Sequence, residues 1–144
     1  MDTKQIALEM NQLHIEHARQ LMQIAALFSS GGEAGVLLWL GRQTDEVFST
    51  DIIEHFGLTP GRVANIVKKL EERGFIQRKI NYEDLRRTYI TLTEAGYRYA
   101  EQLYDELTEK HINIIEALGD ENAADAVHLL QKTVSVIEKA QKFA

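Results

Sequence analysis

Apolar residues recur every three or four positions along both ends of the chain, which is the pattern of long helices with one buried face. The first such stretch covers residues 3–28 and predicts one helix. Ser30 precedes Glu33 by three positions, the spacing of a capping box, and predicts the start of a short second helix. Towards the other end, residues 93–118 and the stretch after Gly119 predict two more long helices. The pattern therefore places long helices on either side of a shorter middle region.

The middle region begins with two short helices joined by a tight turn. Ser49 is a good N-cap, and the helix that follows it is expected to end at Gly57. Two residues further on, Thr59 supplies a second N-cap, with Pro60 at the first helical position. That helix is expected to end at Gly74. The short separation of the two helices is typical of a helix-turn-helix.

After the second helix the pattern becomes that of two strands. Residues 75–80 and 88–92 mix β-branched and aromatic residues with polar ones, and the charged segment 81–87 predicts a hairpin tip between them. This order predicts a winged helix-turn-helix, so the expected fold class is mainly α with a small β-wing. We expect a single domain over residues 1–144, with N- and C-terminal dimerisation helices at about 1–28 and 97–144 around a winged helix-turn-helix core at about 31–96.

The long terminal helices carry more apolar surface than a small winged module can cover. This excess predicts a homodimer whose interface is made by the first and last helices. The alternative is an intramolecular helical bundle, in which the same apolar faces pack within one chain.

Charge is distributed unevenly along the chain, whose net charge is −6. Eight basic and four acidic residues between Pro60 and Ile90 leave that segment at +4, and the remainder carries −10. A basic patch confined to the winged module indicates nucleic acid as its partner, and a chance cluster on a solvated face is the alternative. The absence of cysteine excludes disulfides and thiol-based redox sensing. The longest apolar run, residues 34–41, is far shorter than the ~20 residues of a membrane-spanning helix, so we expect a cytoplasmic protein with no membrane partner.

The second helix of a helix-turn-helix enters the major groove, where its N-terminal residues meet base edges. Arg62 has the paired donors that guanine accepts, and Asn65 has the donor and acceptor that adenine matches. Lys68 and Lys69 lie a turn later, where contacts to phosphate are expected. An ordinary solvent-facing helix side is the alternative. The full set of expected DNA contacts is Ser49, Thr50, Thr59, Gly61, Arg62, Asn65, Lys68, Lys69, Arg86 and Arg87.

The predicted hairpin tip and the start of the preceding helix complete this set. Arg86 and Arg87 suit a narrow, strongly negative minor groove. Asp84 would be repelled by phosphate, so we expect it to orient Arg86 through a charge-assisted hydrogen bond. Ser49 and Thr50 begin a helix, whose backbone N–H groups are donors for a phosphate.

Three segments carry a family resemblance. Leu-Thr-Pro at 58–60, Leu-Glu-Glu-Arg-Gly-Phe-Ile at 70–76, and Asp-Leu-Arg at 84–86 leading to Leu-Thr-Glu-Ala-Gly at 92–96 resemble the MarR family of bacterial transcriptional regulators. The family signature in the wing is Asp-x-Arg, then a strand, then Leu-Thr-x-x-Gly. The resemblance covers essentially the whole chain.

The resemblance implies a homodimer that binds a pseudopalindromic, inverted-repeat operator on double-stranded DNA, usually as a repressor. It also implies a small aromatic or anionic effector, bound between the dimerisation helices and the winged module, which alters the spacing of the two recognition helices. Gly61 and Asn65 stand where the family more commonly has hydroxyl and basic residues, so the resemblance implies no base preference.

The signal that such a regulator senses is less clearly marked in the sequence. His14 and His17 are three apart, and His17 and His111 fall on apolar faces with Glu16 and Glu109 nearby, which would suit a metal-responsive member of the family. A hydrogen-bonded core or interface histidine is the favoured interpretation, since zinc needs at least three convergent protein ligands, and we expect no metal or other cofactor. A pocket for an organic effector would be mostly apolar. The expected lining residues are His17, Phe28, Trp39, Tyr104 and His111.

Two other functions compete with a DNA-binding regulator. Winged helices also serve as protein-interaction modules without DNA binding, and the acidic total charge favours that alternative. An enzyme is the weaker alternative, because no nucleophile with a base, phosphate-binding loop or strong metal-ligand motif is present in the sequence.

Overall fold

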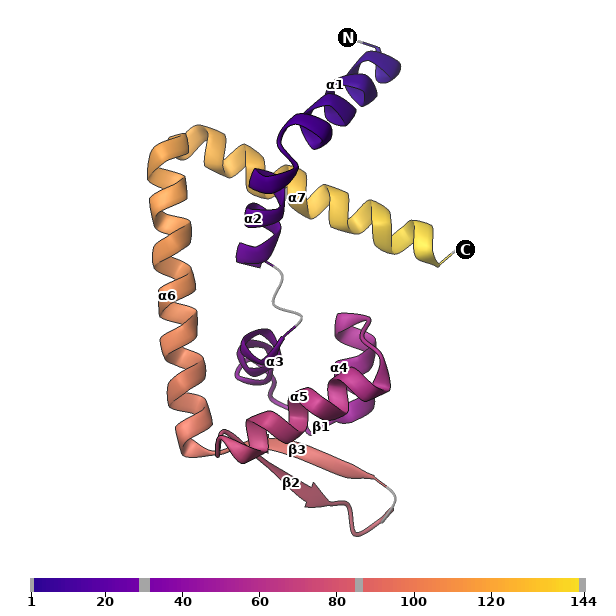
Figure 1. Cartoon of the computed structure of the whole chain (residues 1–144), viewed down its shortest axis with the longest axis vertical. Helices are drawn as coiled ribbons and strands as arrows, with labels where there is room; N and C mark the ends of the chain where they lie inside the picture. Colours follow the sequence, from indigo (N-terminus) through magenta and orange to yellow (C-terminus); the bar gives the residue numbers. More distant parts are fainter. Residues whose placement is uncertain (1, 29–31, 85–86, 143–144) are drawn as a thin grey trace. The chain divides into compact units, whose positions relative to one another are not determined.

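The computed structural model describes residues 2–28, 32–84 and 87–142, and for residues 24–28 it describes the backbone alone. The chain divides into two compact units, Met1–Tyr104 and Asp105–Ala144. The elements follow one another as in Figure 1: α1 (Thr3–Glu16), α2 (Ala18–Phe28), α3 (Glu33–Leu40), β1 (Val47–Phe48), α4 (Ser49–Phe56), α5 (Pro60–Glu72), β2 (Ile76–Ile80), β3 (Thr88–Leu92), α6 (Glu94–Leu118) and α7 (Asp120–Gln141). The predicted fold class, mainly α with a small β-wing, is confirmed.

The hydrophobic core of the first unit lies among the short helices and the sheet. Helix α5 contributes four buried residues at helical spacing, and every other element from α3 to the start of α6 adds at least one. Burying a large aliphatic side chain of this kind contributes about 1.5–3 kcal/mol, so this core holds the helix-turn-helix and the sheet together. Its members are Val36, Leu37, Leu40, Val47, Ile52, Val63, Ile66, Val67, Leu70, Ile76, Ile90 and Ala100.

The turn between α4 and α5 has the local features that the sequence predicts. Helix α4 ends at Phe56, and its C-cap Gly57 has a φ of 61°, in the left-handed region that favours glycine. Thr59 is the N-cap of α5, and its hydroxyl oxygen accepts a hydrogen bond from the Arg62 N–H at 3.2 Å. Pro60 occupies the first helical position. These interactions set where the second helix begins.

The N-cap of α4 differs from the predicted one. The N-cap is Phe48 and not Ser49, which is already the first helical residue. The Asp51 carboxylate accepts a hydrogen bond from the Phe48 N–H at 2.7 Å. Phe48 is extended because it ends strand β1, where it pairs with Tyr89, and the helix therefore starts one residue later than predicted.

The sheet is antiparallel, with the strand order β1-β3-β2. In β2 and β3, Ile76 pairs with Leu92 and Ile80 with Thr88, as a hairpin requires. The two predicted strands are confirmed, and β1 is an addition. A strand of two residues carries no alternation that a sequence pattern would detect.

The N-terminal region differs from the single helix predicted over residues 3–28. The helix is interrupted at His17, whose φ of −120° and ψ of 27° depart from helical values. The His17 N–H still donates to Leu13 O, and the Leu21 N–H to His17 O, so the break is confined to one residue. No glycine or proline marks it in the sequence. The next helix, α3, has Gly32 as its N-cap without a side-chain hydrogen bond, so the capping box predicted from Ser30 is wrong, and Ser30 itself lies outside the described residues.

The long helices at the C-terminal end begin and are interrupted where the sequence predicts. The Thr93 hydroxyl accepts a hydrogen bond from the Gly96 N–H at 3.0 Å and donates to Gly74 O at 2.6 Å, which ties the start of α6 to the end of the α5 segment. Gly119 separates α6 from α7. Among the described residues, no helix combines the length and the apolar content needed to cross a membrane.

Candidate nucleic-acid interface

Helix α5 presents a solvent-facing side opposite its buried residues. At about 100° per residue, Gly61, Asn65 and Lys68 fall within one narrow strip of the helix surface. All three are exposed, whereas the opposite side of the helix lies in the core. Arg62 and Lys69 lie together on one flank of this strip and are also exposed. The structure thus places the predicted base-contacting and phosphate-contacting residues of α5 on one accessible side.

Several cations of the basic segment have acidic partners within the protein. Lys69 Nζ lies 3.8 Å from Glu33 Oε1, and Arg73 Nη1 lies 3.1 Å from the other oxygen of that carboxylate. Lys68 pairs with Glu72 one turn along its own helix, at 3.9 Å. Exposed pairs of this kind are weak, so phosphate can replace the carboxylate. Lys68 and Lys69 are therefore available to DNA only in competition with these partners.

The guanidinium of Arg73 joins the end of α5 to the start of α6. Its Cζ atom lies 4.8 Å from the centre of the Phe75 ring and 5.4 Å from that of Tyr99, and these two rings stack at 4.7 Å. Hydrogen bonds to Tyr99 and Glu33 raise the pKa of Arg73 above its ordinary value. Arg73 is therefore a connecting residue within the module, although the sequence counts it only as one of the basic cluster.

A second pair joins α5 to the wing. Arg78 on β2 donates from Nε and Nη2 to the two carboxylate oxygens of Glu71, at 3.0 and 2.8 Å. Among the described residues, Arg62 and Lys79 are the basic side chains of this segment without an ion-pair or ring partner. The charge of the segment is therefore less freely exposed than its composition suggests.

The start of α4 also contacts the wing next to its tip. The Arg87 guanidinium lies over the Phe48 ring, with its Cζ atom 4.0 Å from the ring centre. Ser49 is half-buried and Thr50 exposed in the first turn of α4, next to that contact in sequence. The structure brings these three predicted DNA-contacting residues, 49, 50 and 87, to one end of α4.

The wing tip is described only in part. Arg86 lies outside the described residues, so the predicted orientation of Arg86 by Asp84 stays a prediction. The Arg87 N–H donates to Asp84 O, and the Asn81 N–H donates to Arg87 O, both at 3.0 Å. These backbone bonds close the hairpin on the inner side of its tip.

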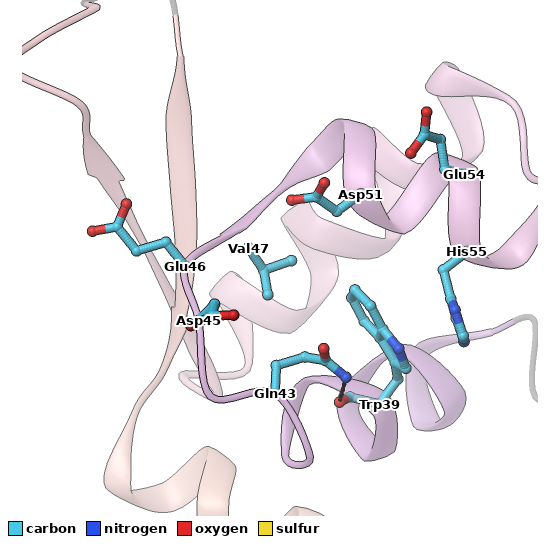
Figure 2. A pocket seen from close by; sticks show the side chains of 8 residues that line it. All are labelled: Trp39, Gln43, Asp45, Glu46, Val47, Asp51, Glu54 and His55. Carbon is cyan, nitrogen blue, oxygen red and sulfur yellow. Dashed lines mark hydrogen bonds between the residues drawn. The ribbon is translucent and has the colours of Figure 1, made fainter.

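Of the residues predicted for an effector pocket, Trp39 lines a depression in the structure. Trp39 is half-buried and lines an open depression of about 450 Å³ with Gln43, Val47, His55 and four carboxylates, as Figure 2 shows. His17, Tyr104 and His111 are not among its lining residues, and the side chain of Phe28 lies outside the described residues. The Trp39 ring stacks on His55 at 4.7 Å. The depression is therefore more acidic than the apolar pocket that the sequence predicts.

The remaining predicted residues have partners of their own or lie at the surface. The Arg42 guanidinium lies over the Tyr104 ring at 3.7 Å, and His17 is exposed at the break between α1 and α2. His111 is half-buried on α6. The His14 ring lies with Nδ1 2.7 Å from Met10 O. Within the described ranges, no three His, Asp or Glu side chains are grouped as metal ligands would be.

Comparison with known proteins shows which proteins this module resembles. Residues 30–87 match the model described as the MarR family. The chain is 30% identical over 82 residues to the uncharacterized HTH-type transcriptional regulator YwhA of Bacillus subtilis, which covers 57% of this chain and 59% of that protein. It is 35% identical over 60 residues to the HTH-type transcriptional regulator Hpr of Lysinibacillus sphaericus, covering 42% and 32% of the two chains. The chain thus spans between about a third and three-fifths of the length of these curated relatives.

Solved structures show the same fold. The Staphylococcus aureus MepR–DNA complex matches with a TM-score of 0.65 at 21% identity, over 94% of this chain and 98% of that one. PcaV of Streptomyces coelicolor, in complex with its natural ligand, matches with a TM-score of 0.65 at 21% identity, over 82% and 89%. At this level of identity the likeness establishes the fold alone.

Proposed function

We propose that this chain, whose residues 30–87 match the MarR family model, is a transcriptional regulator of that family that binds double-stranded DNA with α5 in the major groove. The curated relatives are named as HTH-type transcriptional regulators, and a MepR structure contains DNA. Both findings point to a regulator and away from an enzyme. The wing would then lie over the neighbouring minor groove.

The observation that carries this proposal is the exposed side of α5. Gly61, Asn65 and Lys68 share one strip, and the opposite side of the helix is fixed in the core. Since Gly61 has no side chain and nothing lies within 4 Å of where its Cβ would be, the helix backbone can approach DNA closely there. Insertion into a DNA groove requires a helix whose inner side packs on the protein and whose outer side is exposed.

The proposed roles divide between reading and positioning. Asn65 and Arg62 read base edges, Asn65 from the centre of the strip and Arg62 from its flank. Lys68 and Lys69 contact phosphates after exchanging their carboxylate partners. In the turn between α4 and α5, the Thr59 hydroxyl caps the first turn of α5. Ser49 and Thr50 contribute backbone N–H donors to a phosphate, and Arg86 and Arg87 contact the minor groove from the wing.

We further propose a homodimer that binds an inverted repeat and represses transcription. Many large apolar side chains of α1, α2 and α7 are exposed, among them Ile15, Met22, Leu129 and Val136. Apolar surface on this scale is typical of an oligomer interface, and a twofold dimer reads a twofold operator. The exposed surface is also compatible with the protein-interaction alternative, which the DNA-binding experiment below decides.

A small aromatic or anionic effector completes the proposal. PcaV was solved with its natural ligand, which supports an effector for a protein of the same fold. Trp39, Tyr104 and His111 remain the residues to substitute first, together with His17 and Phe28. Loss of inducer response without loss of DNA binding would identify a pocket residue, and a zinc-dependent change in DNA affinity would favour the metal-responsive alternative.

The decisive experiment measures binding of the full chain to DNA from its own promoter region by fluorescence anisotropy over a range of salt. We expect affinity to fall steeply with salt, because phosphate contacts release counterions. Asn65→Ala should lose discrimination between operator and mismatched duplexes, by about 1–3 kcal/mol at one base pair per half-site. Lys68→Ala should weaken all duplexes alike, and Lys132→Ala on α7 is the control for a change of charge. No rise in anisotropy with promoter DNA at low salt would overturn the proposal in favour of a protein-interaction module.

A further inference from the structure

Strand β2 runs from the core into the wing. The face of the strand that packs on the core at its start continues into the wing at its end. Side chains two apart on a strand lie on the same face, so Ile76, Arg78 and Ile80 share one side. Ile76 is 1% exposed and lies in the core that α5 helps to form, whereas Ile80 is 53% exposed. Arg78 therefore occupies the position at which β2 leaves the core while still facing α5.

At that position an ion pair replaces an apolar contact. The Arg78 guanidinium donates from two nitrogens to both carboxylate oxygens of Glu71, which lies near the end of α5. Two parallel hydrogen bonds of a planar fork restrict direction as well as distance, which a single lysine contact does not. The same hydrogen bonds lower the pKa of Glu71, so its carboxylate stays charged below its ordinary range.

We propose that Glu71 and Arg78 are positioning residues that set the angle of the wing to the recognition helix, so that both reach DNA together. This inference rests on the proposed function, because it concerns how that same interface is held. The pair joins two separate elements, α5 and β2, at the point where the core no longer does so. The neighbouring pair Lys68–Glu72 has no such effect, since both of its residues lie on α5.

The other strand of the wing has a contact of its own. Arg87, directly before β3, lies over the ring of Phe48, the N-cap of α4. The wing is therefore tied to both helices of the helix-turn-helix, β2 to α5 and the start of β3 to α4. Loss of the Glu71–Arg78 pair removes the side-chain contact between α5 and the part of β2 beyond the core, while the pairing of β2 with β3 and the contact of Arg87 with Phe48 remain. We expect the wing then to lose its direction towards the minor groove.

The test uses the full chain and two duplexes of the operator identified by promoter binding. The longer duplex extends past the wing on both sides, and the shorter one is trimmed to the base pairs that α5 covers. Affinities are measured for Glu71→Gln, for Arg78→Gln and for the double exchange Glu71→Arg with Arg78→Glu. Glu72→Gln is the matched control on α5, and Lys79→Gln is the matched control on β2. Thermal unfolding checks that every variant folds.

Each single substitution should weaken binding to the longer duplex by about five- to tenfold, the effect of losing one or two phosphate contacts, and leave the shorter duplex within about twofold. The double exchange should recover most of that loss, and the controls should not show the difference between duplexes. Tighter binding by Glu71→Gln would overturn the inference and make Arg78 a direct phosphate contact. Equal losses on both duplexes, or no recovery in the double exchange, would overturn it as well. If the unsubstituted chain binds neither duplex, the proposed function itself has failed.

Discussion

Gly96 offers a direct test of how closely α6 packs on the winged module. A Cβ atom added at this position would overlap with Phe75 O and would lie 2.9 Å from the Phe75 carbonyl carbon and 3.2 Å from Leu92 Cδ2. The Phe75 carbonyl oxygen is not free to move, because it accepts a hydrogen bond from the Thr93 N–H at 3.0 Å. Gly96→Ala therefore forces the first turn of α6 away from the strand that begins at Ile76.

The magnitude follows from two opposing effects. Overpacking against a fixed backbone atom costs about 3 kcal/mol, at the upper end of the usual range. Alanine in a helix gains about 1 kcal/mol over glycine. The net loss of unfolding free energy should be about 2 kcal/mol, or about 4–8 °C in melting temperature for a chain of this size.

The assay is urea unfolding followed by circular dichroism at one fixed protein concentration, since an oligomer would make stability depend on concentration. Gly61→Ala is the matched control, because it also lies in a helix but has nothing within 4 Å of the added Cβ. It should be neutral or stabilising by up to about 1 kcal/mol. If Gly96→Ala proved as stable as the unsubstituted chain, the close approach of α6 to residue 75 would be refuted.

Three further predictions concern the interface. Thr59→Ala removes the N-cap of α5 and should cost about 1 kcal/mol of stability in urea unfolding, whereas Thr59→Ser should retain most of it. Glu33→Gln removes the carboxylate that competes for Lys69, so anisotropy should show DNA binding about two- to fivefold tighter, and weaker binding would contradict the competition. In carbon-13 NMR the pKa of the Glu71 carboxyl should lie below its ordinary value, because its hydrogen bonds to Arg78 favour the charged form. The pair therefore contributes to the stability of the fold above the pKa that Glu71 has in the unfolded chain. This contribution is lost as pH falls through the lowered pKa of the folded chain. Arg78→Gln should raise that midpoint, and an unchanged midpoint would refute the assigned cause.

The sequence by itself determined the boundaries of the helix-turn-helix. Gly57, Thr59 and Pro60 act within a few positions of their own place in the chain, through a left-handed backbone, a side-chain cap and a fixed φ. The same holds for Thr93, whose hydroxyl caps α6 three residues on. Local interactions of this kind are visible in a sequence because both partners are close together in it.

Strand β1 and the break at His17 are features that the sequence pattern does not predict. Two residues at 47–48 form a strand only because β3, some forty positions later, lies beside them. At His17 the backbone changes direction without a glycine or proline to mark it. Neither feature has a periodic signal in the sequence.

What only the tertiary structure decided is which charges of the basic segment are available. The sequence predicts a segment of +4, but it does not show that Glu33, forty residues from Arg73, neutralises cations of α5, or that Arg78 faces Glu71 across a helix–strand boundary. The physical reason is that an ion pair depends on the distance between side chains, which the packing of separate elements sets. Local chemistry therefore places helix α5 in the sequence, and tertiary packing decides which of its cations have acidic partners within the protein.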